Sequence, residues 1–207
     1  MTHTEKVHVL FGVLTVLTGG AAVWSVYRPA SAARRVWPAL AFLLGLFMLI
    51  PVERGTRTYS EVGWWHTLLS AFPVTAVEFQ TYLHAWIAKV GTTHVLQHKL
   101  TGVAGVITAG IEWGRARASL RDPRWRWLLP LGLLAVGCGL GLHGGTHQHL
   151  PNPVEQLHHK IYGGCFATAA VILALVEGGV VPARWRFAWP VLMFAAGLDM
   201  MLFYRLH

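Results

Sequence analysis

Charged side chains are scarce in this chain of 207 residues, because only 13% of them are Asp, Glu, Lys or Arg. Soluble globular domains carry about 25% charged residues, so this composition argues against a water-soluble protein. Hydrophobic residues make up 54% of the chain, and the mean hydropathy is +0.46. The shortage of charge, together with several apolar runs of near-spanning length, predicts an integral membrane protein.

Acidic residues are the rarer charged class, with 9 Asp and Glu against 17 Lys and Arg. The resulting formal charge of +8 would suggest nucleic-acid binding in a soluble protein. Here the basic residues cluster in short loops between apolar runs, so membrane topology explains them. We therefore expect no nucleic-acid partner.

Two further shortages limit the chemistry. The only cysteines, Cys138 and Cys165, both lie inside expected spans, where cysteine usually acts as a small packing residue. Nothing in their spacing indicates a disulfide, although the sequence leaves that pairing open. The chain also lacks a nucleotide-binding loop, so any transport by this chain is not driven by its own ATP hydrolysis.

The apolar segments predict an all-α bundle of six transmembrane helices in a single domain that covers residues 1–207. A helix of about 20 residues crosses the hydrocarbon core of a bilayer. The connection at 53–91 is long, and its apolar Trp-containing runs predict one or two interfacial helices on the outer side. No internal repeat is evident. The expected spans are His8–Tyr27, Val36–Val52, His94–Ala116, Trp127–His143, Leu157–Gly178 and Phe187–Tyr204.

Arginine sets the expected orientation of the bundle. Three short loops, after the first, third and fifth spans, together hold ten basic residues. The positive-inside rule places this face in the cytoplasm, so we expect a bacterial inner-membrane protein with both termini in the periplasm. The ten residues are Arg28, Arg34, Arg35, Arg115, Arg117, Arg121, Arg124, Arg126, Arg184 and Arg186.

Histidine is unusually abundant, and all twelve histidines fall on the side opposite these arginines. Imidazole is a common ligand of metals and haem, so the one-sided placement predicts a site on the outer face. A membrane conduit with two stacked haems would need a second layer of histidines near the cytoplasm. The sequence has none there, which excludes that arrangement and leaves a single outer haem open.

Seven histidines form the expected metal site. Two are spaced i,i+4 at the start of the third span, which places both on one helix face. Three lie at the end of the fourth span and in the short segment after it, in a His-x-His pattern that suits copper or zinc. Two adjacent histidines open the fifth span, and we expect the second of them to face inward. These candidates are His94, His98, His143, His147, His149, His158 and His159.

Two acidic residues are expected at membrane depth, where a charge calls for an explanation. Glu112 precedes Arg115 by one helical turn, so we expect a local ion pair. Asp199 lies in the outer half of the sixth span and is followed by Met200 and Met201. Thioethers suit Cu(I), although methionine in a membrane helix usually serves packing.

The latter half of the chain resembles the CopD-type copper-resistance membrane proteins. The resemblance rests on a His-x3-His pair that starts a helix, a Glu-Trp-x-Arg stretch near the end of that helix, an apolar helix that ends in histidine, a His-rich outer loop, and a His-Lys-x-x-Gly segment in the next helix. It implies a multi-helix inner-membrane bundle, similar to that of cytochrome b561, that handles copper through His98, His143 and His159. The matching segments are His94–Arg117, Leu128–His149 and Gln156–Val176.

These observations predict a copper-binding protein that handles or delivers copper on the periplasmic side. The alternative is a redox enzyme or electron-transfer subunit with an outer haem b or a di-metal centre, and zinc and iron are the other metals considered. A structural subunit with inert histidines explains the pattern least well. The bilayer and a periplasmic metal-carrying protein are the expected partners. The sequence leaves the oligomeric state and enzymatic activity open, and it assigns no catalytic residue.

Overall fold

The computed structural model describes residues 3–49, 93–143 and 153–206, and all regular structure within these ranges is helical. The predicted all-α class is therefore confirmed, and each predicted span coincides with one α helix. The interfacial helices predicted at 53–91 lie outside the described residues. The elements are α1 (His3–Tyr27), α2 (Ala33–Leu49), α5 (Thr93–Ala116), the 3-10 turn η2 (Pro123–Trp127), α6 (Leu128–His143), α7 (Pro153–Glu177), η3 (Ala183–Phe187) and α8 (Ala188–Leu206).

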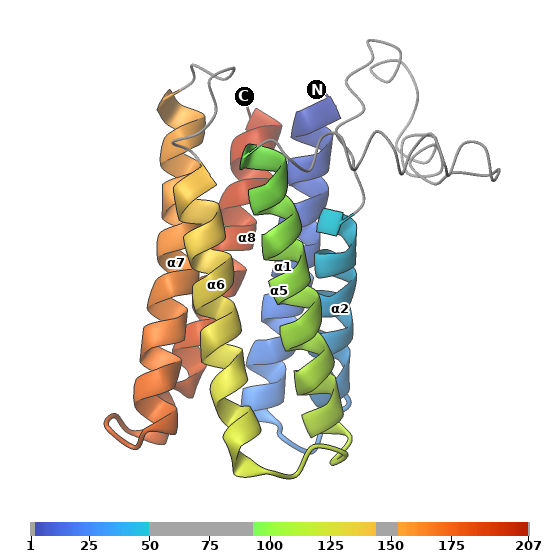
Figure 1. The fold of residues 1–207 in the computed structure, drawn as a ribbon, viewed down its shortest axis with the longest axis vertical. Helices are drawn as coiled ribbons and strands as arrows, with labels where there is room; N and C mark the ends of the chain where they lie inside the picture. The colour runs from blue at the N-terminus through green and yellow to red at the C-terminus, as the bar shows by residue number, and fades with distance from the viewer. Residues whose placement is uncertain (1–2, 50–92, 144–152, 207) are drawn as a thin grey trace, which may run out of the picture.

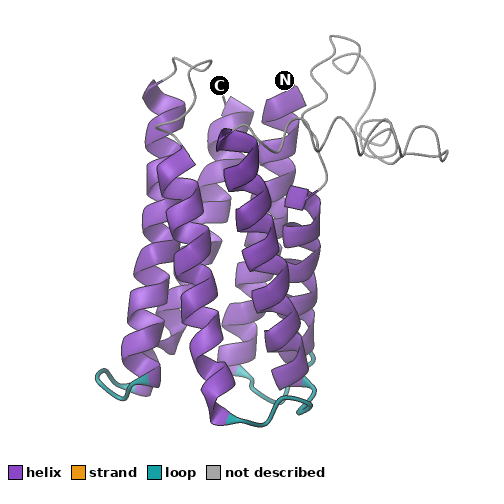
Figure 2. Cartoon of the chain, in the orientation of Figure 1, coloured by secondary structure: helices purple, strands orange, loops and turns teal. Residues whose placement is uncertain are grey.

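The helices stand side by side and form a closed ring. Each packs chiefly on two neighbours, in the cyclic order α1, α2, α5, α6, α7, α8 and back to α1. Figure 1 shows that the chain starts and ends at the same end of this bundle, because successive helices run in opposite directions. The three short connections at 28–32, 117–122 and 178–182 all lie at the other end (Figure 2), which therefore holds the predicted arginine-rich face.

Four segments are long and apolar enough to cross a membrane, namely His8–Tyr27, Pro123–Leu142, Gln156–Glu177 and Ala183–Phe203. In the second and fourth of these, a 3-10 turn continues directly into an α helix. Helix α2 is shorter, with 17 residues, and α5 carries Lys99 and Glu112. The chain thus has the apolar helices of a membrane protein, and the described structure counts four clear spans where the sequence predicted six.

Glycine lets the helices approach at backbone distance in three equivalent places. A Cβ atom added at Gly45, Gly137 or Gly197 would lie 2.7–2.8 Å from a backbone nitrogen of the adjoining helix. It would also lie 2.9–3.0 Å from the carbonyl oxygen of a glycine on that helix. The interfaces are α2–α5, α6–α7 and α8–α1, and the facing glycines are Gly102, Gly163 and Gly12. Small residues of this kind are typical of tightly packed membrane helices.

These contacts reveal an internal repeat, so our expectation of none was wrong. Gly45, Gly137 and Gly197 each follow a buried proline by seven residues, and each proline lies in the first turns of its helix. The repeating unit is a helical hairpin, present as α1–α2, α5–α6 and α7–α8. The second helix of each hairpin packs on the first helix of the next, and the third hairpin closes on the first, as subunits do in a cyclic assembly. The prolines are Pro38, Pro130 and Pro190.

The residue before each of these prolines is buried near the arginine-rich end of the ring. Trp37, Leu129 and Trp189 are all buried in the hydrophobic core. The rings of Trp37 and Trp189 meet edge-on, with centroids 5.1 Å apart. Equivalent residues of different hairpins therefore meet near a common axis, which supports the cyclic arrangement.

The glycine contacts give a direct test of the packing. A Cβ at Gly163 would lie 2.5 Å from the Gly141 nitrogen, whereas one at the neighbouring Gly164 meets nothing within 4 Å. Overpacking costs about 1–3 kcal/mol. We therefore expect Gly163→Ala to lower the melting temperature in detergent by about 3–10 °C, as measured by circular dichroism.

Gly164→Ala is the matched control for this experiment. It should keep or slightly raise the melting temperature, because alanine favours the helix and finds open space at this position. Equal melting temperatures for the two variants would contradict the close approach of α7 to α6.

Candidate functional site

Two histidines from different helices meet at the end of the bundle opposite the arginines. The ring of His8 on α1 lies edge-on to the ring of His159 on α7, with centroids 5.7 Å apart and an interplanar angle of 84°. His159 is only 6% exposed, which confirms the prediction that it faces inward. Tyr162, one turn further along α7, is fully buried and its ring centroid lies 6.0 Å from that of His159.

The neighbouring histidine is held in a separate contact. Nδ1 of His158 lies 2.6 Å from Oδ2 of Asp199 on α8. The His158 ring also stacks on Phe203 of α8, with centroids 3.7 Å apart. A carboxylate on one ring nitrogen fixes the orientation of an imidazole. These two contacts therefore fix His158 against α8, while His159 turns toward α1.

Helix α5 brings a third histidine and a buried cation to the same end. His98 is half-buried, and the adjacent Lys99 is only 6% exposed. The Lys99 ammonium group donates a hydrogen bond of 3.1 Å to the carbonyl oxygen of Met48, which lies in the last turn of α2. A cation stabilises the carbonyls at a helix C-terminus. Lys99 therefore ties α5 to α2 directly beside His98.

The described side chains include three of the seven predicted ligands, and the structure separates these three into different contacts. His159 pairs with His8, His158 pairs with Asp199, and His98 lies on α5. Among the side chains that the structure describes, no three of the His, Cys, Asp or Glu type are grouped closely enough to hold a metal ion. The full site stays a prediction, because His94 and His143 lie in helices where their side chains are not described, and His147 and His149 lie outside the described ranges.

The ring separation of the His8–His159 pair is compatible with a shared metal ion. With metal–nitrogen distances of about 2.0–2.1 Å, two imidazoles on one ion have ring centroids about 5–6 Å apart. The observed separation of 5.7 Å falls in this range. His8 is not among the seven predicted metal ligands, because it has no other histidine at i,i+4. The sequence places it only among the possible ligands of a single outer haem, together with His98, His143 and His159. The signal that could have found it is its place in the repeat.

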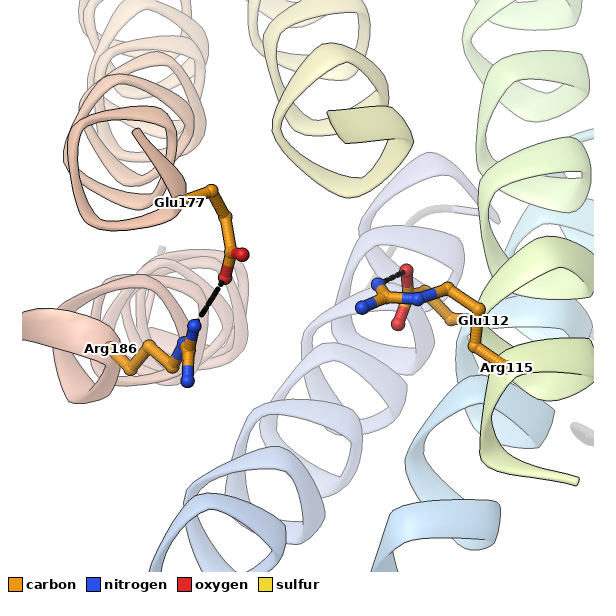
Figure 3. A network of polar contacts seen from close by, with 4 residues as sticks. All are labelled: Glu112, Arg115, Glu177 and Arg186. Atoms are coloured by element: carbon orange, nitrogen blue, oxygen red, sulfur yellow. Dashed lines mark hydrogen bonds and ion pairs between the residues drawn. The ribbon is translucent and has the colours of Figure 1, made fainter. Parts of the chain in front are cut away.

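Acidic groups at the arginine-rich end are neutralised locally (Figure 3). Glu112 accepts a hydrogen bond from Arg115, which confirms the predicted ion pair. Glu177 at the end of α7 lies 2.9 Å from Arg186 of η3. These ion pairs account for the charges of Glu112 and Glu177, so neither acid needs a functional site to explain its presence.

Two other sequence interpretations are also resolved. Cys138 and Cys165 are both free thiols, so they do not form the disulfide that the sequence left open. Met200 is buried in the hydrophobic core, which fits the packing role usual for methionine in a membrane helix.

Comparison with protein-family models, curated proteins and solved structures finds no match to this chain.

The bond from Lys99 to α2 yields a stability prediction. Lys99→Met removes the charged donor and leaves the Met48 carbonyl without it, so we expect a loss of about 1–2 kcal/mol. The repeat supplies a matched control in Lys160, which follows His159 as Lys99 follows His98 but is exposed. Lys160→Met should change stability by less than about 0.5 kcal/mol.

Chemical or thermal denaturation in one detergent measures both variants. If Lys99→Met proves as stable as Lys160→Met, the hydrogen bond to α2 does not contribute to the stability of the bundle.

Proposed function

We propose that this chain is a bacterial inner-membrane protein that binds copper at the histidine-bearing end of its helix bundle. Its function is to handle or deliver copper on the periplasmic side. The observation that carries the proposal is the meeting of His8 and His159 at 5.7 Å, with His159 buried inside the bundle. A pair of imidazoles drawn from two helices, one of them buried, is a natural start for a metal site.

The proposed topology has six spans. Large aliphatic side chains are exposed on α2 and α5 as well as on the longer helices, for example Leu43, Leu100 and Ile107. Such faces suit lipid better than water, and a short helix such as α2 is accommodated by local thinning of the bilayer. The arginine-rich end is cytoplasmic by the positive-inside rule, so the histidine pair and both termini face the periplasm.

Copper is the metal that this environment favours. Imidazole nitrogens are neutral donors, and imidazole is a good ligand for copper. Charge at membrane depth is costly, so a monovalent Cu(I) ion on neutral ligands costs less than a divalent ion. The resemblance of the latter half of the chain to CopD-type proteins supports the same choice. Delivery then requires a periplasmic metal-carrying protein as the partner.

Metal analysis of the purified protein tests this proposal. We expect about one copper ion per chain after loading with Cu(I) and removal of excess ion, and no Soret band in the absorption spectrum. His159→Ala should reduce the copper content by more than half, because it removes the buried member of the pair. Elemental analysis and protein quantification on the same sample give the ratio.

Lys160→Ala is the control, because this neighbour of His159 is exposed and should leave the copper content unchanged. A Soret band would indicate a haem site in place of copper. A protein that holds neither metal nor haem after loading would refute the proposal.

A further inference from the structure

The first helices of the three hairpins share a motif that the glycine contacts bring into register. Each carries a histidine four residues before the glycine that faces the preceding hairpin. The motifs are His8-x3-Gly12, His98-x3-Gly102 and His159-x3-Gly163. The three histidines precede Pro38, Pro130 and Pro190 by 30, 32 and 31 residues. The identical spacing to the glycine and the nearly equal spacing to the proline indicate that they are equivalent positions of the repeat.

Equivalence in sequence places these histidines at one depth. The carbonyl oxygens of Gly12, Gly102 and Gly163 lie 2.9–3.0 Å from the Cβ position of the facing glycine in all three interfaces. Each histidine lies one helical turn from a glycine held in this way. His8, His98 and His159 therefore form one layer across the bundle, and each comes from a different hairpin.

The opposite end shows how equivalent residues behave near the axis. Trp37 and Trp189 occupy equivalent positions in the first and third hairpins, and their rings meet at 5.1 Å. His8 and His159 come from the same two hairpins and meet at 5.7 Å. The second hairpin contributes the buried Leu129 to the tryptophan layer, and it contributes His98 to the histidine layer.

We propose that His8, His98 and His159 bind one copper ion on the pseudo-threefold axis, with one imidazole from each hairpin. This inference rests on the proposed copper-binding function. It identifies the ligand set and leaves out His158, because the His158 ring packs on Phe203 and bonds Asp199 of α8, while His159 meets His8 of α1. The described structure does not yet group three ligands, so binding requires the His98 ring to turn toward the pair. His98 lies within one turn of the buried Thr101 and Gly102, on the inward face of α5.

The His8–His159 contact joins only the first and third hairpins. An ion that also binds His98 would join all three hairpins at this end of the bundle. A ligand that binds the folded state alone stabilises it according to its concentration and affinity. Copper should therefore raise the melting temperature of the bundle. This stabilisation depends on all three histidines, because each supplies one of the three links.

Copper affinity of single variants of the full-length protein tests the ligand set. Titration with Cu(I) against a competing chelator should show a loss of more than about 100-fold in affinity for His8→Ala, His98→Ala and His159→Ala alike, since even indirect partners of a metal site contribute 10–100-fold. The copper-induced rise in melting temperature should disappear in all three. His158→Ala is the matched control, and its affinity should stay within about threefold of the parent protein.

The outcomes separate the two proposals. If the parent protein does not bind copper, the proposed function fails and this inference fails with it. If the parent protein binds copper and His98→Ala binds equally well, the axial site is wrong while the proposed function stands. The same holds if His158→Ala loses as much affinity as His159→Ala. Should an alanine variant fail to fold, His→Asn at that position replaces it, because asparagine preserves polarity but does not replace the imidazole ligand.

Discussion

Backbone-to-backbone contact at glycine is the constraint on which this structure depends. Each of three glycines allows its helix to pack directly on the backbone of the facing helix. In all three places, an added Cβ would lie 2.7–2.8 Å from a backbone nitrogen and 2.9–3.0 Å from a glycine carbonyl oxygen. The glycines are Gly45, Gly137 and Gly197. A larger side chain at any of these positions would push the pair apart, since the nearest atoms are backbone and have no rotamer to change. The three contacts fix the axial register of the hairpins, and this register places equivalent side chains at equal depth.

The two ends of the bundle differ because the repeat carries different residues at each level. At the arginine-rich end the axis is filled by apolar side chains such as Trp37 and Trp189, and the nearby acids pair with arginine. At the other end, His8 and His159 from the first helices of the same two hairpins meet. One end is thus closed and apolar, while the other offers nitrogen donors.

The sequence was sufficient to predict the helices but not their arrangement. Apolar length locates a helix such as α1, although this helix begins at His3 and not at the predicted His8. The local spacing of Glu112 and Arg115 is sufficient to predict their ion pair. Contacts between distant parts of the chain could not be predicted in this way. His8 and His159 are far apart in the sequence, and the packing of α1 on α8 closes the ring and brings them together. Dense clusters dominate the histidine pattern, so the isolated His8 was left out of the predicted metal ligands. The repeat was hidden because few residues recur and because the hairpins are joined by segments of very different length.

X-ray absorption spectroscopy at the copper edge of the loaded, full-length protein tests the central claim most directly, because it counts the atoms bound to the metal. The account predicts three imidazole nitrogens at about 2.0 Å from one copper ion and no sulfur neighbour. A first shell with thiolate or thioether sulfur at about 2.3 Å, or one with fewer than three imidazoles, would contradict it.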